Sequence, residues 1–273
     1  MATTGLQLRS QVNEDNTLEL CLEEVTFPEP GPGEVLVRIE ATPINPSDIA
    51  LLFGPADLAT ARAGGTVERP VLTADIPENL MRMVAGRIGQ SLPVGNEGAG
   101  VVVAAGDSAA AQALLGRTVG VVGGEMFAQY RCVDASQCLP LQEGTTAAQG
   151  ASCFVNPMTT LGMVETMRME GHTALVHTAA ASNLGQMLNR VCAADGIDLV
   201  NIVRKPGQEA ILRDLGAKFI VNSSGDNFMG ELTEALAATG AGVAFDAIGG
   251  GKLAGQILPG WEAVAARSRS GDN

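Results

Sequence analysis

Apolar and polar residues alternate along much of the first half of the chain. Leu18, Leu20 and Leu22 alternate with polar neighbours within 17–25, and residues 34–41 alternate again as EVLVRIEA after a turn rich in proline and glycine. Such alternation between turns is typical of half-buried β-strands. Further strands are predicted over 98–105, 117–122 and 127–133. This half is therefore predicted to be a β-rich domain.

From about residue 150 the pattern changes to strands that alternate with helices. A helix predicted over 155–169 turns four apolar residues toward the core: Met158, Leu161, Val164 and Met167. Strands are predicted over 173–178, 198–203, 218–221 and 242–248, with helices over 184–194, 208–215 and 228–238. Repeated βα units indicate a parallel sheet with helices on both faces. The sequence therefore predicts an α/β chain of two domains, 1–147 and 148–273, with the boundary within 145–150.

One segment of the first domain, residues 55–90, lacks a clear pattern. It is polar and interrupted by proline and glycine, and only a short helix over 78–84 is indicated. Connections of this length without structure of their own are uncommon in compact domains. The segment is therefore predicted to be a lid-like insertion or a locally disordered stretch.

Composition narrows the classes of protein that fit. The net charge of −13 disfavours nucleic acid and anionic membrane surfaces as partners. No apolar run is long enough to span a membrane, and the N-terminus lacks the apolar core of a signal peptide, which predicts a cytoplasmic protein. The five scattered cysteines and two histidines do not show the spacing of a disulfide framework or a metal site.

Residues 175–186, which read LVHTAAASNLGQ, resemble a strand, a tight turn and the start of a helix. A dinucleotide phosphate binds at such a turn because backbone N–H groups approach it closely, and small residues permit that approach. Ala179, Ala180, Ala181 and Ser182 are all small, and Gly185 allows close packing of helix and strand. A strand that enters a buried helix through small residues has the same pattern, so both interpretations stay open.

Arg204 and Lys205 follow the next predicted strand. In NAD-preferring folds an acidic residue at this place binds the ribose hydroxyls. The basic pair instead suits a 2′-phosphate and predicts NADPH as the cofactor. Two solvated charges on a loop are the alternative.

Seven collinear segments together resemble the medium-chain dehydrogenase/reductase family, in its zinc-independent branch of quinone oxidoreductases and enoyl-thioester reductases. The segments are PGPGEVLVRIEA (30–41), PINPSDI (43–49), VGNEGAGVVVAAGD (94–107), NPMTTLGMV (156–164), LVHTAAASNLGQ (175–186), LGAKFIVN (215–222) and FDAIGG (245–250). The resemblance implies a GroES-like β-domain followed by a doubly wound Rossmann domain, with the nicotinamide in the cleft between them and a homodimeric assembly.

The resemblance also implies the site residues. Asn45 is the candidate catalytic residue, and Asn45 and Thr159 are expected to line the nicotinamide site. The expected cofactor-binding residues are Asn45, Thr159, Thr178, Ala179, Ala180, Ser182, Asn183, Leu184, Gly185, Arg204, Lys205 and Asn222. His177, Glu97 and Asp48 are interpreted as structural residues.

Zinc-dependent relatives have a cysteine where this chain has Asn45 and a histidine where it has Asn96, so the resemblance implies a zinc-independent enzyme. Without a Lewis acid, a quinone is an easier substrate than a ketone, because its reduced oxygen resembles a phenolate with a pKa near ~10. The predicted activity is hydride transfer from NADPH to a quinone or another conjugated carbonyl.

Two alternatives remain. Enoyl-thioester reductases place a tyrosine proton donor shortly after the PINPSDI motif, where this chain has Ala56, and Tyr130 is the only tyrosine. That departure weakens the enoyl-reductase interpretation without removing it. The sequence after residue 258 lacks the two strands expected next, which predicts a truncated or altered C-terminus, missing dimer strands and an exposed edge at 242–248. A non-catalytic NADPH-binding protein is the second alternative.

Overall fold

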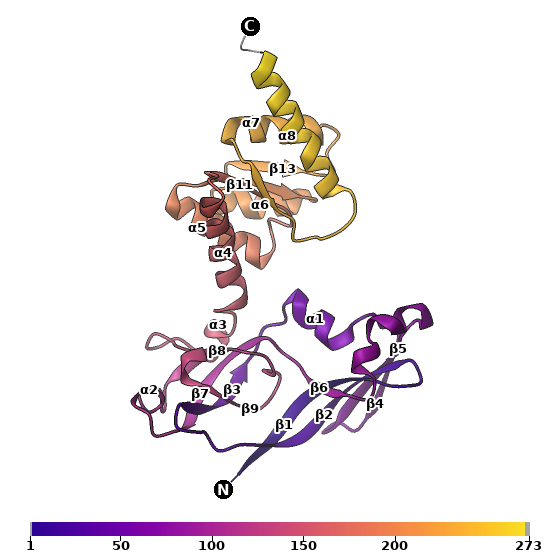
Figure 1. The fold of residues 1–273 in the computed structure, drawn as a ribbon, viewed down its shortest axis with the longest axis vertical. Coiled ribbons are helices and arrows are strands. Elements are labelled where there is room, and N and C mark those ends of the chain that lie inside the picture. Colours follow the sequence, from indigo (N-terminus) through magenta and orange to yellow (C-terminus); the bar gives the residue numbers. More distant parts are fainter. Residues whose placement is uncertain (1, 271–273) are drawn as a thin grey trace. The chain divides into compact units, whose positions relative to one another are not determined.

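The computed structural model describes residues 2–270, which form two compact units that divide after Val155 (Figure 1). The first unit contains two five-stranded antiparallel sheets. The order of the first sheet is β4 (Asp57–Gly65), β5 (Pro70–Asp75), β2 (Thr17–Phe27), β1 (Thr3–Val12) and β6 (Ser91–Pro93). The order of the second is β10 (Cys138–Pro140), β8 (Thr118–Val122), β7 (Glu97–Ala105), β3 (Glu34–Ala41) and β9 (Tyr130–Asp134).

Short helices connect these strands. They are α1 (Pro46–Phe53), α2 (Ala109–Gln112) and α3 (Ala147–Gly150), with 3₁₀ turns η1 (Glu78–Met83), η2 (Ala85–Arg87) and η3 (Ala135–Gln137). Proline at the first position of α1 suits a helix start, because that position needs no backbone N–H. Apolar side chains of the second sheet, among them Val35, Val37 and Val119, form one core cluster, and Val12 and Leu18 of the first sheet belong to another.

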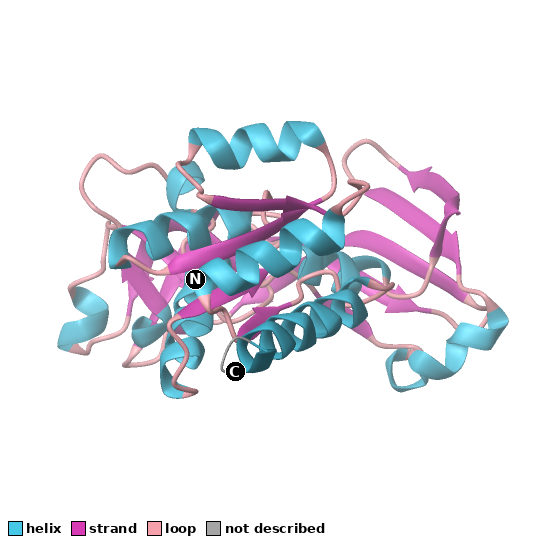
Figure 2. Cartoon of the chain, turned by 90° about the horizontal axis from the view of Figure 1, so that it is seen from above, coloured by secondary structure: helices cyan, strands magenta, loops and turns pink. Residues whose placement is uncertain are grey.

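The second unit is built on a parallel sheet in the order β13 (Phe219–Asn222), β12 (Asp198–Val203), β11 (Ala174–His177) and β14 (Val243–Phe245). The helices α4 (Val155–Met169) and α5 (Asn183–Asp195) pack on one face through Val164 and Leu188. The helices α7 (Phe228–Thr239) and α8 (Leu253–Ser270) cover the other face through Leu232 and Ile257, and α6 (Pro206–Asp214) joins β12 to β13. Figure 2 shows the helices and strands by colour.

The predicted α/β class is confirmed: a β-domain is followed by a parallel sheet with helices on both faces. Strand β14 lies at an edge, as the expected strand order requires. Val164 and Met167 are buried as predicted, but Met158 and Leu161 are 60% and 57% exposed, so their predicted core positions were wrong. Both residues come before Val164 in α4, whereas the part of the helix that packs on Leu175 begins later.

Residues 55–90 differ from the prediction of a lid-like or disordered segment. The structure places β4 and β5 there, and β5 pairs with β2 as part of the first sheet. All but one residue of β4 are exposed, so its sequence carries no burial pattern that alternation could reveal. Among the described helices, none combines the length and the apolar character that a membrane crossing requires.

Candidate functional site

The turn between β11 and α5 has the geometry of an anion site. Ser182 is the N-cap of α5, and its Oγ accepts a hydrogen bond from the Gly185 N–H at 3.1 Å. Among the described residues, the N–H groups of Asn183 and Leu184 have no acceptor. Unpaired N–H groups at a helix start carry partial positive charge and bind phosphates. The Ser182 hydroxyl can still donate its own proton to such a group.

Close packing fixes the shape of this turn. A Cβ on Gly185 would lie 2.2 Å from the carbonyl oxygen of Ala180, so no other residue fits there without a backbone shift. Ala179 has a φ of 50°, a left-handed conformation that residues other than glycine adopt rarely. The Ala180 N–H donates to the Ile202 carbonyl of β12 at 3.2 Å, which ties the turn to the neighbouring strand. The turn is therefore a constrained, small-residue passage from strand to helix.

Thr178 begins the turn, and the protein itself engages its hydroxyl. The buried Oγ1 donates to Asp246 Oδ1 at 2.7 Å and accepts from the Ala247 N–H at 2.9 Å. The hydrogen bond from Thr178 is the main reason why the pKa of Asp246 is lowered. Thr178 therefore joins the carboxyl ends of β11 and β14, a positioning role that the sequence did not indicate.

The basic pair lies at the carboxyl end of β12, on the same edge of the sheet as the turn. Arg204 and Lys205 are both exposed, and within the described residues neither makes an ion pair. Their backbone N–H groups both donate to Gln208 Oε1, at 2.9 and 3.0 Å. The side-chain amide of Gln208 therefore holds the backbone of the pair, while both cationic groups face solvent.

Asn222 ends β13 beside this pair, but its side chain is bound within the protein. Its Nδ2 donates to Glu209 Oε1 at 2.7 Å, and its Oδ1 accepts from the Ser224 N–H at 3.0 Å. The hydrogen bond from Asn222, followed by that from Arg213, lowers the pKa of Glu209. Sequence reasoning missed both Gln208 and Glu209. The spacing of Lys205 and Gln208, which matches the cap and third positions of a helix start, could have found Gln208.

The expected phosphate-binding residues thus meet at one edge of the parallel sheet. The carboxyl ends of β11, β12 and β13 are in register there, since His177 pairs with Asn201 and Val203 with Asn222. The unpaired amides of α5, the close packing at Gly185 and the unpaired basic side chains of 204–205 fit the phosphates of a dinucleotide. Thr159, by contrast, is an exposed residue of α4. This helix packs on β11 through residues that follow Thr159 in the sequence.

In the first unit, Asn45 lies at the start of α1 in a buried polar cluster. Asn45 Nδ2 donates to Glu97 Oε1 at 2.9 Å, and Asn45 N–H donates to Asp48 Oδ2 at 2.8 Å. The second oxygen of Asp48 accepts from the Asn96 N–H at 2.9 Å. Asn45, Asp48 and Glu97 are each at least 96% buried. The two carboxylates therefore fix the backbone and the side chain of Asn45.

Asn96 has a partner as well, because its Nδ2 donates to Ser47 Oγ at 3.0 Å. Within residues 2–270, no three His, Cys, Asp or Glu side chains come together in a way that could hold a metal ion. Tyr130 is a strand residue whose ring packs against Phe27, with the centroids 5.8 Å apart. The tyrosine is thus part of a structural cluster of the first unit.

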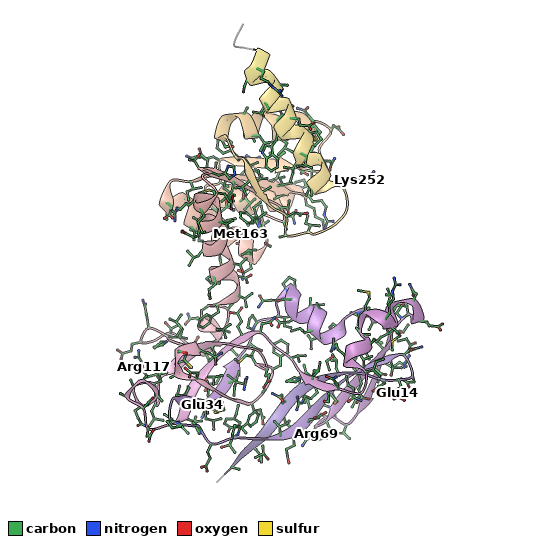
Figure 3. The ribbon with its side chains drawn as sticks, viewed as in Figure 1. Glu14, Glu34, Arg69, Arg117, Met163 and Lys252 are labelled. Carbon is green, nitrogen blue, oxygen red and sulfur yellow. The ribbon has the colours of Figure 1, made fainter. Side chains whose placement is uncertain are left out.

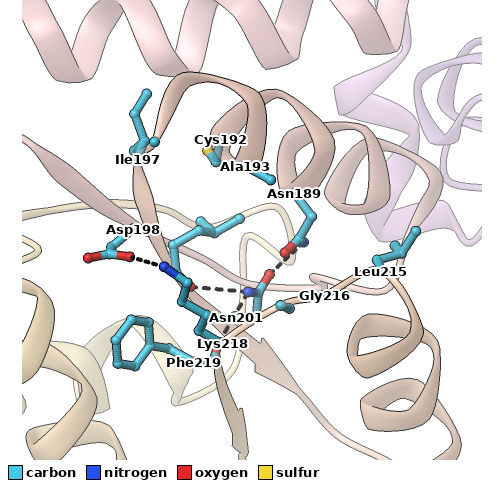
Figure 4. Close-up of a pocket in the computed structure, with 13 residues that line it drawn as sticks. Asn189, Cys192, Ala193, Ile197, Asp198, Asn201, Leu215, Gly216, Lys218 and Phe219 are labelled. Carbon is cyan, nitrogen blue, oxygen red and sulfur yellow. Dashed lines mark hydrogen bonds and ion pairs between the residues drawn. The ribbon is translucent and has the colours of Figure 1, made fainter.

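The second unit also has a cavity of about 140 Å³ away from these residues (Figure 4). It lies near the amino ends of β12 and β13, between Asp198, Lys218 and the end of α5. Its floor holds Asn189 and Asn201, whose side chains are joined by a hydrogen bond of 2.7 Å. Because the phosphate turn lies at the carboxyl ends of the strands, this cavity is not part of the expected cofactor site.

Comparison with known proteins agrees with this arrangement. Residues 31–143 match the family model of the alcohol dehydrogenase GroES-like domain. A putative NADPH:quinone reductase from Mesorhizobium loti superimposes with a TM-score of 0.69 at 26% identity, over 95% of this chain and 72% of that one. The two units therefore define an oxidoreductase fold with a GroES-like domain and a Rossmann-like domain. The first unit carries a GroES-like domain of the alcohol dehydrogenase type, and the chain as a whole resembles the medium-chain dehydrogenase/reductases.

Curated relatives that match this chain are longer than it. Rat mitochondrial enoyl-acyl-carrier-protein reductase is 29% identical over 183 residues, which is 59% of this chain and 46% of the relative. A mycocerosic acid synthase-like polyketide synthase of Mycobacterium tuberculosis is 25% identical over 232 residues, 84% of this chain and 10% of the relative. The chain thus spans a tenth to about half of the length of these relatives.

Proposed function

We propose that this chain is an NADPH-dependent, zinc-independent oxidoreductase that transfers hydride to a quinone or another conjugated carbonyl. One observation carries the proposal. Among the described residues, the first two N–H groups of α5 have no acceptor and the side chains of Arg204 and Lys205 make no ion pair, and both groups lie at the same edge of the parallel sheet. Amides at a helix start suit the pyrophosphate, and a pair of exposed cations suits a 2′-phosphate. NADPH would supply the hydride when bound.

The chemistry of Asn45 and Asn96 supports the zinc-independent part of the proposal. Amide side chains are poor zinc ligands, and both donate hydrogen bonds to protein oxygens through their Nδ2 atoms. An acceptor whose reduced oxygen is delocalised and weakly basic needs little electrophilic help. Quinones and enones have this property, so the work left to the protein is to hold the acceptor and exclude water.

Steady-state oxidation of NADPH tests the proposal with a panel of quinones, enones and simple ketones. Turnover is expected with quinones or enones and not with simple ketones. NADPH binding measured by calorimetry is the companion experiment, because binding without turnover on any acceptor would favour a non-catalytic NADPH-binding protein. Absence of both binding and turnover would contradict the proposal.

A second candidate is a 2-enoyl-thioester reductase, favoured by the similarity to the rat enoyl-acyl-carrier-protein reductase. Ala56, at the place of the expected tyrosine, packs against an apolar cluster of the first unit and carries no proton. A reaction of this kind would take its proton from water. Assay with a 2-enoyl thioester distinguishes the candidates, since a kcat/KM above that for every quinone would favour this one.

A further inference from the structure

Glu97, the first residue of β7, is a carboxylate enclosed by the protein. Glu97 is only 1% exposed, and within the described residues its carboxylate makes no ion pair. Three N–H groups bind it instead. Oε1 accepts from Asn45 Nδ2 at 2.9 Å, and Oε2 accepts from the backbone N–H groups of Phe154 at 2.8 Å and Val155 at 3.0 Å.

This environment gives the carboxylate a specific task. A buried charge is costly unless several hydrogen bonds compensate it, and removal of Glu97 would take away the acceptor of one buried and two half-buried donors. Val155 is the first residue of α4, so the negative charge also lies at the positive end of a 15-residue helix. One side chain therefore holds both Asn45 and the start of α4.

The hydrogen bond also settles which way the amide of Asn45 faces. A carboxylate can only accept, so the nitrogen of the amide must point to Glu97 and the amide oxygen away from it. A donor at position 97 would favour the opposite orientation. The orientation of the Asn45 amide thus depends on the chemistry of a residue that is distant by 52 positions in sequence.

We propose that Glu97 is a positioning residue for hydride transfer: it fixes the orientation of Asn45 and the first residue of α4, Val155. The inference rests on the proposed function, because it takes Asn45 as a residue of the nicotinamide site. The hydrogen bonds of Glu97 all go to residues of its own unit, whereas the phosphate turn and the basic pair belong to the second unit. Loss of Glu97 should therefore slow hydride transfer while NADPH affinity is kept.

The variant Glu97→Gln tests this, because it keeps the size of the side chain and replaces one acceptor with a donor. Its kcat for quinone reduction should fall about tenfold or more, while the Kd of NADPH changes by less than about threefold. The ¹⁵N spectrum should show displaced side-chain NH₂ signals of Asn45. Equal kcat in the variant and the parent protein would overturn the proposal.

Glu34→Gln is the matched control. Glu34, labelled in Figure 3, lies on β3 of the same unit, and its Oε2 accepts from the Gly31 N–H at 2.9 Å. This change also removes a carboxylate that binds a backbone amide, so it reproduces a general loss of stability in the unit. It should leave kcat and the Asn45 signals unchanged. A fall in kcat as large as that of Glu97→Gln would overturn the positioning role.

A readout without turnover separates this inference from the proposed function. If the parent protein binds NADPH but reduces no acceptor, the proposed function fails and the fluorescence of bound nicotinamide decides on Glu97. Changed emission per bound NADPH in Glu97→Gln at saturation, with unchanged emission in Glu34→Gln, supports the positioning role. Identical emission and identical Asn45 signals in all three proteins contradict it.

Discussion

His177, at the end of β11, is a buried histidine whose proton can be assigned. Its Nδ1 lies 3.2 Å from the Phe245 carbonyl oxygen, and because a carbonyl only accepts, Nδ1 carries the proton in the neutral ring. Nε2 is buried and has no partner among the described residues. Burial, opposed by the Phe245 carbonyl and by Asp246, lowers the pKa of His177. The burial of His177 fits the predicted core position, but the prediction of a satisfied core residue holds only for Nδ1.

Acidification should therefore destabilise the protein through His177. The folded-state pKa lies below the unfolded value of about 6.5, so the unfolded chain binds more protons just below that pH. The stabilisation is complete above about pH 6.5 and is lost as the pH falls toward the folded-state pKa, by up to ~1.4 kcal/mol per pH unit. Urea unfolding of the parent protein and of His177→Asn, measured at several pH values from about 6.5 downward, checks this dependence of the unfolding free energy on pH. The same slope in both proteins would contradict it.

Arg204 and Lys205 should determine the choice between NADPH and NADH. The double variant Arg204→Ala, Lys205→Ala is expected to bind NADPH about 10–100-fold more weakly, because two charged contacts to the 2′-phosphate are lost. NADH lacks that phosphate, so its Kd should change by less than about threefold. Calorimetric titration with both nucleotides measures this preference. Arg190→Ala, Lys218→Ala removes the same charge elsewhere in the unit and should not change it, whereas equal losses for both nucleotides would refute the assignment.

At the scale of elements, Gly185 should be the least replaceable residue of the α5 start. In Gly185→Ala the new methyl group would meet the Ala180 carbonyl, and the forced shift should cost about 1–3 kcal/mol of unfolding free energy. NADPH binding should weaken as well, since the amides of the turn move. Thermal unfolding and calorimetry measure the two effects.

Gly162→Ala is the matched control for that change. Gly162 is an exposed glycine inside α4, and a Cβ there would meet nothing within 4 Å. Alanine should stabilise this helix by roughly 0.5–1 kcal/mol and leave NADPH binding unchanged. A tighter or unchanged NADPH Kd in Gly185→Ala would show that the turn does not need the close approach.

The sequence predicts best those elements in which burial and apolarity coincide. Strand β3 has the predicted bounds, because its buried positions are valines and a leucine. Strand β1 was missed because its inward positions include Gly5, Gln7 and Ser10, which break the apolar alternation although they are buried. Helix α1 was also missed, although Asn45, Pro46 and Asp48 form a helix-start signal that could have revealed it.

The same limit applies to the candidate site. Sequence motifs predicted the turn and the basic pair, because each consists of residues that are neighbours in the sequence. The partners of Thr178, Asn222 and Asn45 come from other elements, as in the bond between Asn45 and Glu97, and only the folded chain brings them together. The assignment of these residues to cofactor binding stays a prediction that the variants described above will test.

At the scale of the whole molecule, the edge strand β14 should promote self-association. It carries apolar residues. The exposed Ile248 follows the strand closely in the sequence, and the exposed Leu258 lines an apolar cavity that the strand also lines. Unpaired strand edges with apolar surroundings pair with other chains. Sedimentation should show association that grows with concentration and that Ile248→Lys, Leu258→Lys reduces. Leu139→Lys, an exposed leucine of the first unit, is the control and should have no such effect.

The hydrogen bonds of Glu97 have a consequence for the order of folding during synthesis. The strands of both sheets of the first unit end by Pro140, so the ribosome has made them all before Phe154 and Val155 appear. Every strand that flanks Glu97 is therefore available for pairing before the start of α4, which binds its carboxylate, is made. Because domains fold as units from the N-terminus during translation, the first unit can serve as the template on which the helix leading into the second unit begins.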